Sequence, residues 1–292
     1  MNFKSVHFVF LTLTIAASSI FSGCRNEPEE GEFLRIMTFN IRYANPDDGD
    51  FIWSNRKDWV GEIIGGSEAH VIGLQEALRH QIDTLSSFLP AYRWIGRARN
   101  DGKNSGEFSP LFYRPDLLDM EENGTFWLSS TPQDTGSVGW DAALPRIATW
   151  ARFRIRDTNT QFLAVNTHFD HRGKRARLES ARLLNRWVRN RSESFPVVMM
   201  GDFNTLSSDP PYAALLGELP DVIDTVVIAD TTRALQTFRG FEAGGATPVR
   251  IDYIFVTPGI ILRSHVVLDE DRDGRYPSDH LPVVVDLELM RP

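Results

Sequence analysis

Short runs of hydrophobic residues, each ended by polar or turn-forming residues, recur along the chain from residue 34 onward. Runs of this length, rich in valine, isoleucine, leucine and phenylalanine, are typical of buried β-strands. We therefore predict strands over residues 34–39, 71–74, 109–113, 149–155, 162–165, 197–200, 251–256 and 283–287.

Three segments between these runs have the spacing of amphipathic helices, over residues 54–64, 81–88 and 174–189. Serine caps helix N-termini well, so we expect the first helix to begin with Ser54 as its cap. In the third segment apolar residues recur on one side and arginines on the other, which predicts a buried stripe and a solvent-exposed basic face. Strands interspersed with helices in this way predict an α/β domain whose sheets are covered by helices.

The first 24 residues have a different pattern, which we interpret as a lipoprotein signal. Lys4 precedes an apolar stretch over residues 8–21 that is too short to span a bilayer comfortably. Small residues then lead to Cys24, which resembles the bacterial signal whose cysteine is lipidated. We expect a signal over 1–24, a tether over 25–31 and one domain over 32–292. The protein would be exported and lipid-anchored in the bacterial cell envelope, at the outer membrane or cell surface; the alternative is an ordinary secretory signal.

Composition narrows the possible chemistry. The chain has 292 residues and a formal net charge of −8, and repulsion of this sign opposes nonspecific coating of nucleic acid. Its single cysteine excludes an internal disulfide, a paired-cysteine redox site and a cysteine-rich zinc site. Only four of its 31 basic residues are lysines, and the planar fork of arginine suits phosphate groups. The composition is therefore compatible with a phosphate-ester substrate.

Polar residues stand next to the predicted strands at five places. Asn40 follows the first strand, Glu76 the second, His168 the fifth and Asp202 the sixth, while His280 precedes the last. In α/β folds the loops at strand ends gather ligand-binding groups, so we expect these side chains to converge. Amide, carboxylate and imidazole groups together are what a hard divalent cation and a phosphate ester require.

Six segments that carry these residues resemble the endonuclease/exonuclease/phosphatase superfamily, and they occur in the order found in that superfamily. They cover residues 37–42, 74–76, 166–171, 201–204, 250–254 and 278–280. The resemblance implies a deoxyribonuclease-like α/β fold, a four-layer sandwich of two packed mixed β-sheets flanked by helices. It also implies hydrolysis of phosphate esters with Mg²⁺ (or Mn²⁺) as the cofactor.

The resemblance implies residues for the metal and for the phosphate. Glu76 matches the principal metal ligand, with Asn40 beside it and Asp279 contributing a further oxygen. Such oxygen ligands suit a hard cation, which polarises a phosphoryl oxygen and stabilises a leaving oxygen. His168 matches a residue that contacts the phosphate, and Asn166 supports the same site.

The catalytic roles follow from the same resemblance. Asp202 matches the residue that orients or deprotonates the attacking water, and Asn204 holds the phosphate or the nucleophile. His280 matches the imidazole that faces the scissile phosphate. Asp252 matches the carboxylate that orients this imidazole and favours its protonated form.

Four further residues are candidates for contact with the substrate. Glu107 and Arg146 lie in segments that resemble a bacterial subset of the superfamily. Arg146 would bind phosphate or form a structural ion pair, and Trp140 would line the pocket or pack a loop. His171 would reach the cleft or anchor the helix that follows it.

The sequence leaves the substrate open. A nucleic acid, a nucleotide, an inositol phosphate and a phospholipid head group all remain possible, which keeps both a nuclease and a phosphatase in view. No protein partner is predicted; the membrane is expected to be contacted through the lipid at Cys24. The alternative function is a catalytically inactive surface binding protein on the same fold. Such a protein is expected to have lost part of the metal and catalytic set, none of which is missing.

We predict that Cys24→Ser releases the protein from the membrane fraction, because the serine hydroxyl cannot carry the thioether-linked lipid. Fractionation of cells that express each form, followed by immunoblotting, measures this. A Cys24→Ser protein recovered wholly with membranes would contradict the lipoprotein interpretation.

Overall fold

The computed structural model describes residues 31–217, 222–228 and 236–290. The strands of the first sheet are β1 (Glu32–Asn40), β2 (Val71–Gln75), β3 (Arg93–Ile95), β4 (Leu111–Tyr113), β11 (Ile260–Val267) and β12 (Val283–Leu289). Those of the second sheet are β5 (Leu118–Trp127), β6 (Ile147–Ile155), β7 (Gln161–His168), β8 (Val197–Asp202), β9 (Ile223–Asp224) and β10 (Asp252–Val256).

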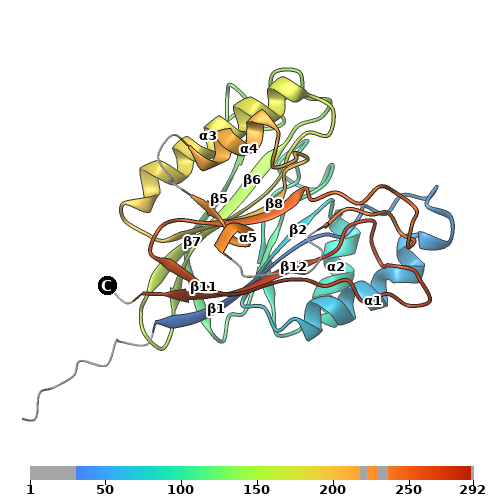
Figure 1. The fold of residues 1–292 in the computed structure, drawn as a ribbon, viewed down its shortest axis with the longest axis horizontal. Helices are drawn as coiled ribbons and strands as arrows, with labels where there is room; N and C mark the ends of the chain where they lie inside the picture. Colours follow the sequence, from blue (N-terminus) through green and yellow to red (C-terminus); the bar gives the residue numbers. More distant parts are fainter. Residues whose placement is uncertain (1–30, 218–221, 229–235, 291–292) are drawn as a thin grey trace, which may run out of the picture.

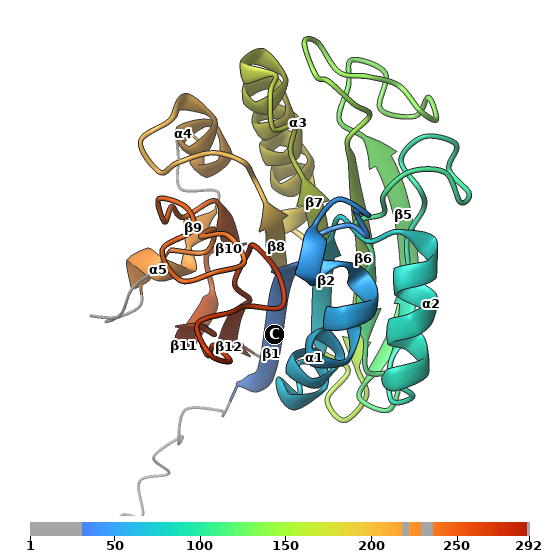
Figure 2. The same cartoon turned by 90° about the vertical axis from the view of Figure 1, so that its right-hand side faces the viewer.

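Both sheets are mixed and contain six strands in the described part of the chain. The first has the order β11-β12-β1-β2-β4-β3 and the second β5-β6-β7-β8-β10-β9. Each contains one parallel pair, β1 with β2 and β7 with β8, and its other pairs are antiparallel. The central strands β1 and β2 lie against β7 and β8 of the other sheet (Figure 2).

Helices cover the outer faces of the paired sheets (Figure 1). The helices beside the first sheet are α1 (Trp53–Gly66) and α2 (Arg79–Phe88); those beside the second are α3 (Lys174–Ser192) and α4 (Pro210–Leu216). The short η1 (Gly49–Phe51) precedes α1, and the short α5 (Thr225–Ile228) contacts β10 and β11. The arrangement is the predicted four-layer α/β sandwich of the deoxyribonuclease-like fold.

The alternation of side chains along each strand divides the hydrophobic residues among three layers. In β1, Leu34 and Ile36 point into the core between the sheets, whereas Met37 and Phe39 pack toward α1 and α2. A third core lies between the second sheet and α3 and α4. Because successive residues of a strand face opposite sides, one strand supplies two layers.

The inner core becomes polar toward the carboxyl end of β1, and a buried amide joins the two sheets there. Asn166 of β7 is fully buried and donates to the carbonyls of Leu74 and Pro110 at 2.8 and 2.9 Å. Its Oδ1 accepts from Gln75 Nε2 at 2.6 Å. Gly73 makes room for this contact, because a Cβ there would lie 2.7 Å from Asn166 Cγ. All of these bonds cross from one sheet to the other.

Every strand and helix predicted from the sequence is present, most with longer bounds. The arginines of α3 are exposed as expected: Arg175, Arg182, Arg186 and Arg189. The expected cap is wrong, since Ile52 is the N-cap of α1 and Ser54 lies inside the helix. Strands β3, β5, β9 and β11 and helices α4 and α5 were not predicted.

The expected signal over 1–24, with Cys24, lies outside the described residues, as does the tether up to residue 30. Among the residues that are described, no helix is both long and apolar enough to cross a bilayer. Lipid anchoring therefore stays a prediction.

We predict that Gly73→Ala lowers the free energy of unfolding by about 1–3 kcal/mol, as overpacking of a filled core does. The new methyl would meet Asn166 and Met200 at under 3 Å, and the hydrogen bonds of Asn166 prevent it from moving aside. Urea unfolding followed by tryptophan fluorescence measures the change. Gly66→Ala is the control, because nothing lies within 4 Å of that added Cβ and the residue is helical. Equal stability of the two variants would show that the space above Gly73 is not constrained.

Candidate active site

The polar residues of the inner face meet at one end of the two sheets because of strand register. His168, the last residue of β7, lies beside Asp202, the last residue of the parallel strand β8. Asp202 is also paired with Asp252, the first residue of the antiparallel strand β10. Across the sandwich Asn40 ends β1 beside Gln75. The carboxyl ends of four strands and the first residue of β10 therefore bring their polar side chains to one place.

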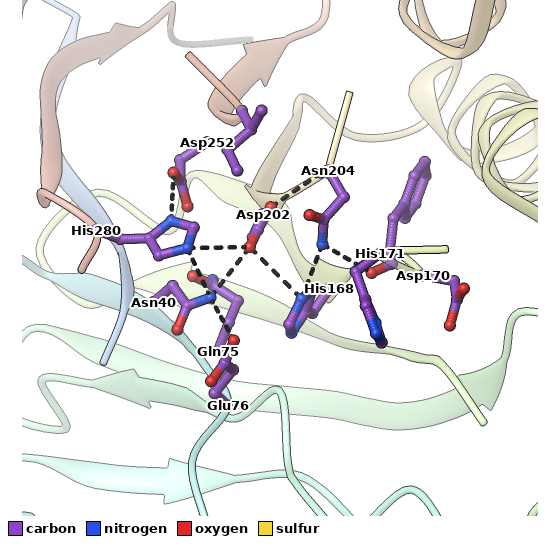
Figure 3. Close-up of polar contacts among 12 residues, drawn as sticks. Asn40, Gln75, Glu76, His168, Asp170, His171, Asp202, Asn204, Asp252 and His280 are labelled. Atoms are coloured by element: carbon purple, nitrogen blue, oxygen red, sulfur yellow. Dashed lines mark hydrogen bonds and ion pairs between the residues drawn. The ribbon is translucent and has the colours of Figure 1, made fainter. Parts of the chain in front are cut away.

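A buried chain of charged groups runs from Asp252 through His280 to Asp202 (Figure 3). Asp252 Oδ2 lies 2.9 Å from His280 Nδ1, and His280 Nε2 lies 3.7 Å from Asp202 Oδ2. Burial opposes charge on His280, but the two carboxylates outweigh it and raise the imidazole pKa well above its usual value. His280 is therefore a cation at neutral pH.

The loop before β12 fixes His280 by contacts with β1 and with a neighbouring ring. Ser278 Oγ donates to the carbonyl of Asn40 at 2.7 Å, and the same oxygen accepts the N–H of His280 at 3.3 Å. Phe238 packs edge-on against the imidazole, with the ring centroids 5.0 Å apart. These contacts restrict the ring to the orientation that faces Asp202.

Asp202 is the carboxylate on which the other groups converge. Its Oδ2 accepts from Asn40 Nδ2 at 3.0 Å and lies 3.5 Å from His168 Nε2, while its Oδ1 accepts the N–H of Asn204 at 2.9 Å. Burial and the neighbouring Asp252 raise its pKa to about 7, although the positive charge of His280 opposes the shift. This carboxyl group can therefore exchange a proton near neutral pH.

Asn40 links Asp202 to the second carboxylate of the site, Glu76. Its Nδ2 donates to Glu76 Oε1 at 3.1 Å, and the other carboxylate oxygen of Glu76 accepts from the backbone of Tyr43 at 3.0 Å. Glu76 is the first residue after β2 and has a positive φ of 60°, which costs a residue with a Cβ some conformational energy. This backbone conformation turns the chain at the end of β2 and places the side chain of Glu76 beside Asn40.

Two neighbouring groups of ligand atoms could hold a divalent cation. Atoms of Asp202, Asp252 and His280 lie within 4.8 Å of one another, but the cationic His280 already bridges these carboxylates. Glu76 and Asp279 fit better. Burial and then the negative charge of Glu76 raise the pKa of Asp279, although the positive charges of His280 and of Arg42, 3.8 Å away, oppose the shift. Two neighbouring, half-buried carboxylates are stabilised by a cation between them. These two, with the amide of Asn40, are the residues that would hold Mg²⁺ or Mn²⁺.

Asn204 and His168 form the other side of the site, and their hydrogen bonds define the imidazole tautomer. Asn204 Nδ2 lies 3.1 Å from the carbonyl of Phe169, which can only accept, so this atom carries the amide protons. The same Nδ2 is 3.0 Å from His168 Nε2, which must then accept. Burial first, and then the charges of Arg146 and Arg99, lower the pKa of His168 well below its usual value. His168 is therefore neutral and carries its proton on Nδ1.

Arg146 is buried beside the site and is held by two residues of the loop after β7. Its Nε lies 3.4 Å from Asp170 Oδ2, and its Nη2 lies 2.9 Å from Nδ1 of the exposed His171. Despite burial, backbone N–H groups and Arg146 lower the pKa of Asp170 to about 2. Arg146 therefore forms the structural ion pair, and its side chain also lines a small pocket beside His168.

Three further predicted residues, Glu107, Trp140 and Asn166, differ in their position relative to the site. Glu107 accepts from Arg99 at 2.6 Å and lies 4.0 Å from His168 Nδ1, so the fold brings it to the site. Trp140 is half-buried in the loop between β5 and β6. Asn166 lies beneath the site, and the hydrogen bonds of its side-chain amide join the two sheets.

Two buried arginines that border the site were not identified from the sequence. Arg56 of α1 donates to the carbonyls of Ile41, Arg42 and Tyr43, and so fixes the backbone that follows Asn40. Its position in register with the buried Val60 of the same helix was a usable signal. Arg99 lies in an irregular loop, where no periodicity could reveal its burial.

Comparisons with known proteins agree with this geometry. A model of the endonuclease/exonuclease/phosphatase family matches residues 37–280. A crystal structure of a protein of that family from Bacteroides thetaiotaomicron is 36% identical, covers 89% of this chain and 99% of its own, and superposes with a TM-score of 0.84. The mannosyl-6-phosphatase Bt3783 of the same species is 38% identical, covers 87% of this chain and 99% of its own, and has a TM-score of 0.82.

A more distant relative is Nocturnin of Drosophila melanogaster, which is 24% identical over 319 aligned positions. The alignment includes 91% of this chain but only 48% of the relative, so the chain spans about half the length of that protein.

Proposed function

The chain belongs to the endonuclease/exonuclease/phosphatase family, whose members hydrolyse phosphate esters, and we propose that it is a divalent-metal-dependent phosphomonoesterase acting on a phosphorylated sugar. The observation that carries hydrolysis is the convergence of Asn40, His168, Asn204 and His280 on the buried carboxylate of Asp202. The sugar is suggested by the mannosyl-6-phosphatase, which is 38% identical over most of its length. The net charge of −8 also favours a small substrate over a long polyanion.

In the proposed reaction Asp202 takes the proton of the attacking water. Its pKa of about 7 matches that role at neutral pH, and Asn204, bonded to it through the backbone, positions the water and the phosphate. A divalent cation held by Glu76, Asp279 and Asn40 would neutralise charge on the phosphoryl and leaving oxygens.

The two histidines serve the phosphate differently because their charges differ. His280, kept protonated by Asp252, supplies a positive charge and an Nε2–H donor to the oxygens on which negative charge grows. His168 is neutral, and its ring is fixed by Asn204 next to the same carboxylate. A fixed donor such as His280 needs no reorganisation as the transition state forms.

We also propose that the protein acts outside the cytoplasm, exported and anchored by a lipid on Cys24. The support is the sequence pattern of residues 1–24, in which the chain's one cysteine follows an apolar stretch and two small residues.

We predict that Asp202→Asn and His280→Ala each lower kcat for a sugar phosphate by at least about 100-fold, the usual range for loss of a general base or a charge-stabilising donor. Steady-state phosphate release measures this. Asp116→Asn is the control, since Asp116 is an exposed partner of Arg114 away from the site. Circular dichroism verifies that the variants are folded. Undiminished turnover in either folded variant would remove that residue from the mechanism.

We predict that a chelator abolishes hydrolysis and that Mg²⁺ or Mn²⁺ restores it, because the carboxylates of Glu76 and Asp279 would hold the cation that neutralises charge on the phosphate. Glu76→Gln should raise the Mg²⁺ concentration needed for half-maximal activity by about tenfold or more, as expected for loss of a charged ligand. Titration of metal-free enzyme measures both effects. Full activity after exhaustive chelation would refute metal dependence.

A further inference from the structure

Three buried nitrogen atoms near the site make no hydrogen bond within the described residues. They are Nε of Arg99, Nη1 of Arg146 and Nδ1 of His168. All three side chains are more than nine-tenths buried, being 8, 4 and 6% exposed. A buried donor without a partner costs about 1–3 kcal/mol, so three in one place indicate that another group belongs there.

The three residues line one small pocket together with Glu107, Ser109 and Ile147. The pocket has a volume of about 10 Å³, which is the space of a single water molecule or hydroxyl group. It lies behind the imidazole of His168, whose opposite nitrogen faces Asn204 and Asp202. A group in this pocket is therefore one imidazole ring away from the place where the phosphate reacts.

The pocket has more unpartnered hydrogen-bond donors than acceptors. Arginine nitrogens only donate, and the contact of Asn204 with Nε2 of His168 leaves the proton of His168 on Nδ1, so all three unpartnered atoms are donors. Glu107 supplies the acceptor, and it is already bound to Arg99 at 2.6 Å. A ligand must therefore accept hydrogen bonds from the cationic side of the pocket and tolerate, or donate to, a carboxylate.

An anionic oxygen meets only part of this requirement. Burial, and then the negative charge of Glu76, already disfavour the ionised form of Glu107, although Arg99 and Arg146 oppose them. A phosphate placed against Glu107 would add a further negative charge beside that carboxyl group. A hydroxyl group fits, because its oxygen can accept from two donors while its proton goes to Glu107.

We propose that this pocket binds a substrate hydroxyl on a carbon close to the one that bears the phosphate. The proposal rests on the phosphomonoesterase function and adds a specificity element to it. Glu107 and Arg99 select a polyol or sugar phosphate over a simple alkyl phosphate. The catalytic residues around Asp202 contact only the phosphate and do not distinguish the two. Loss of the hydroxyl leaves the pocket donors and Glu107 without partners, which is costly in a buried site.

The test compares two phosphomonoesters that differ by one group, 2-hydroxypropyl phosphate and propyl phosphate. The wild-type enzyme with Mg²⁺ should have a kcat/KM at least about tenfold higher for the hydroxylated compound, mainly through KM, as one hydrogen bond to charged groups predicts. Glu107→Gln should bring the ratio of the two kcat/KM values close to one.

Glu62→Gln is the matched control, because Glu62 also pairs with an arginine, Arg272, but on the exposed surface of α1. It should keep the wild-type ratio. Arg99→Lys is the second variant, used if Glu107→Gln does not fold; it retains charge but loses the fork, and should also abolish the preference.

Equal kcat/KM for both compounds in the wild-type enzyme would mean that the pocket holds an ordered water only, and would overturn the proposal while leaving the phosphomonoesterase intact. A Glu107→Gln variant with lower KM for both compounds would identify a phosphate oxygen as the occupant and would also overturn it. If the wild-type enzyme hydrolyses neither compound nor any sugar phosphate, the proposed function fails and this inference fails with it.

Discussion

The side-chain carboxamide of Asn166 joins the two sheets by hydrogen bonds. These bonds lie directly below the active-site residues, where the apolar core ends. The side-chain nitrogen and oxygen of Asn166 bond to Leu74 and Gln75 of the opposite sheet and to Pro110, just before β4, and the missing side chain of Gly73 lets it approach. Apolar packing alone allows two sheets to slide by small amounts, whereas directional bonds between buried amides do not. His168 lies two positions after Asn166 and Glu76 directly follows Gln75, so this contact fixes the separation of these two site residues.

The site above that contact depends on giving two histidines opposite charges within one cluster. His280 lies between two carboxylates and is cationic; His168 lies near Arg99 and Arg146 and is neutral. Both rings flank Asp202, so a single carboxylate has a charged donor on one side and an uncharged ring on the other. Environment rather than residue type assigns the roles, as in other enzymes that separate the pKa values of like groups.

The sequence predicted the buried strands because β1, β2, β7, β8 and β10 are apolar on both faces over most of their length. It did not reveal β5 or β11, whose polar residues and bulges belong to sheet edges. The motif residues Glu76, Asp202 and His280 could be found because they follow or precede apolar runs. Arg99 could not, since its burial results from a loop folding against Glu107. Contacts made by irregular segments produce no periodic pattern of hydrophobic residues in the sequence.

Strand β1 connects the two ends of the molecule. It begins at Glu32, where the chain arrives from its N-terminal segment, and ends at Asn40 in the site, roughly 27 Å away at the rise of an extended strand. The proposed attachment at Cys24 precedes the Glu32 end of β1, so the site lies at the end of the strand that is farther along the chain from the attachment. The length of β1 thus separates the attached end of the domain from Asp202 and its neighbours.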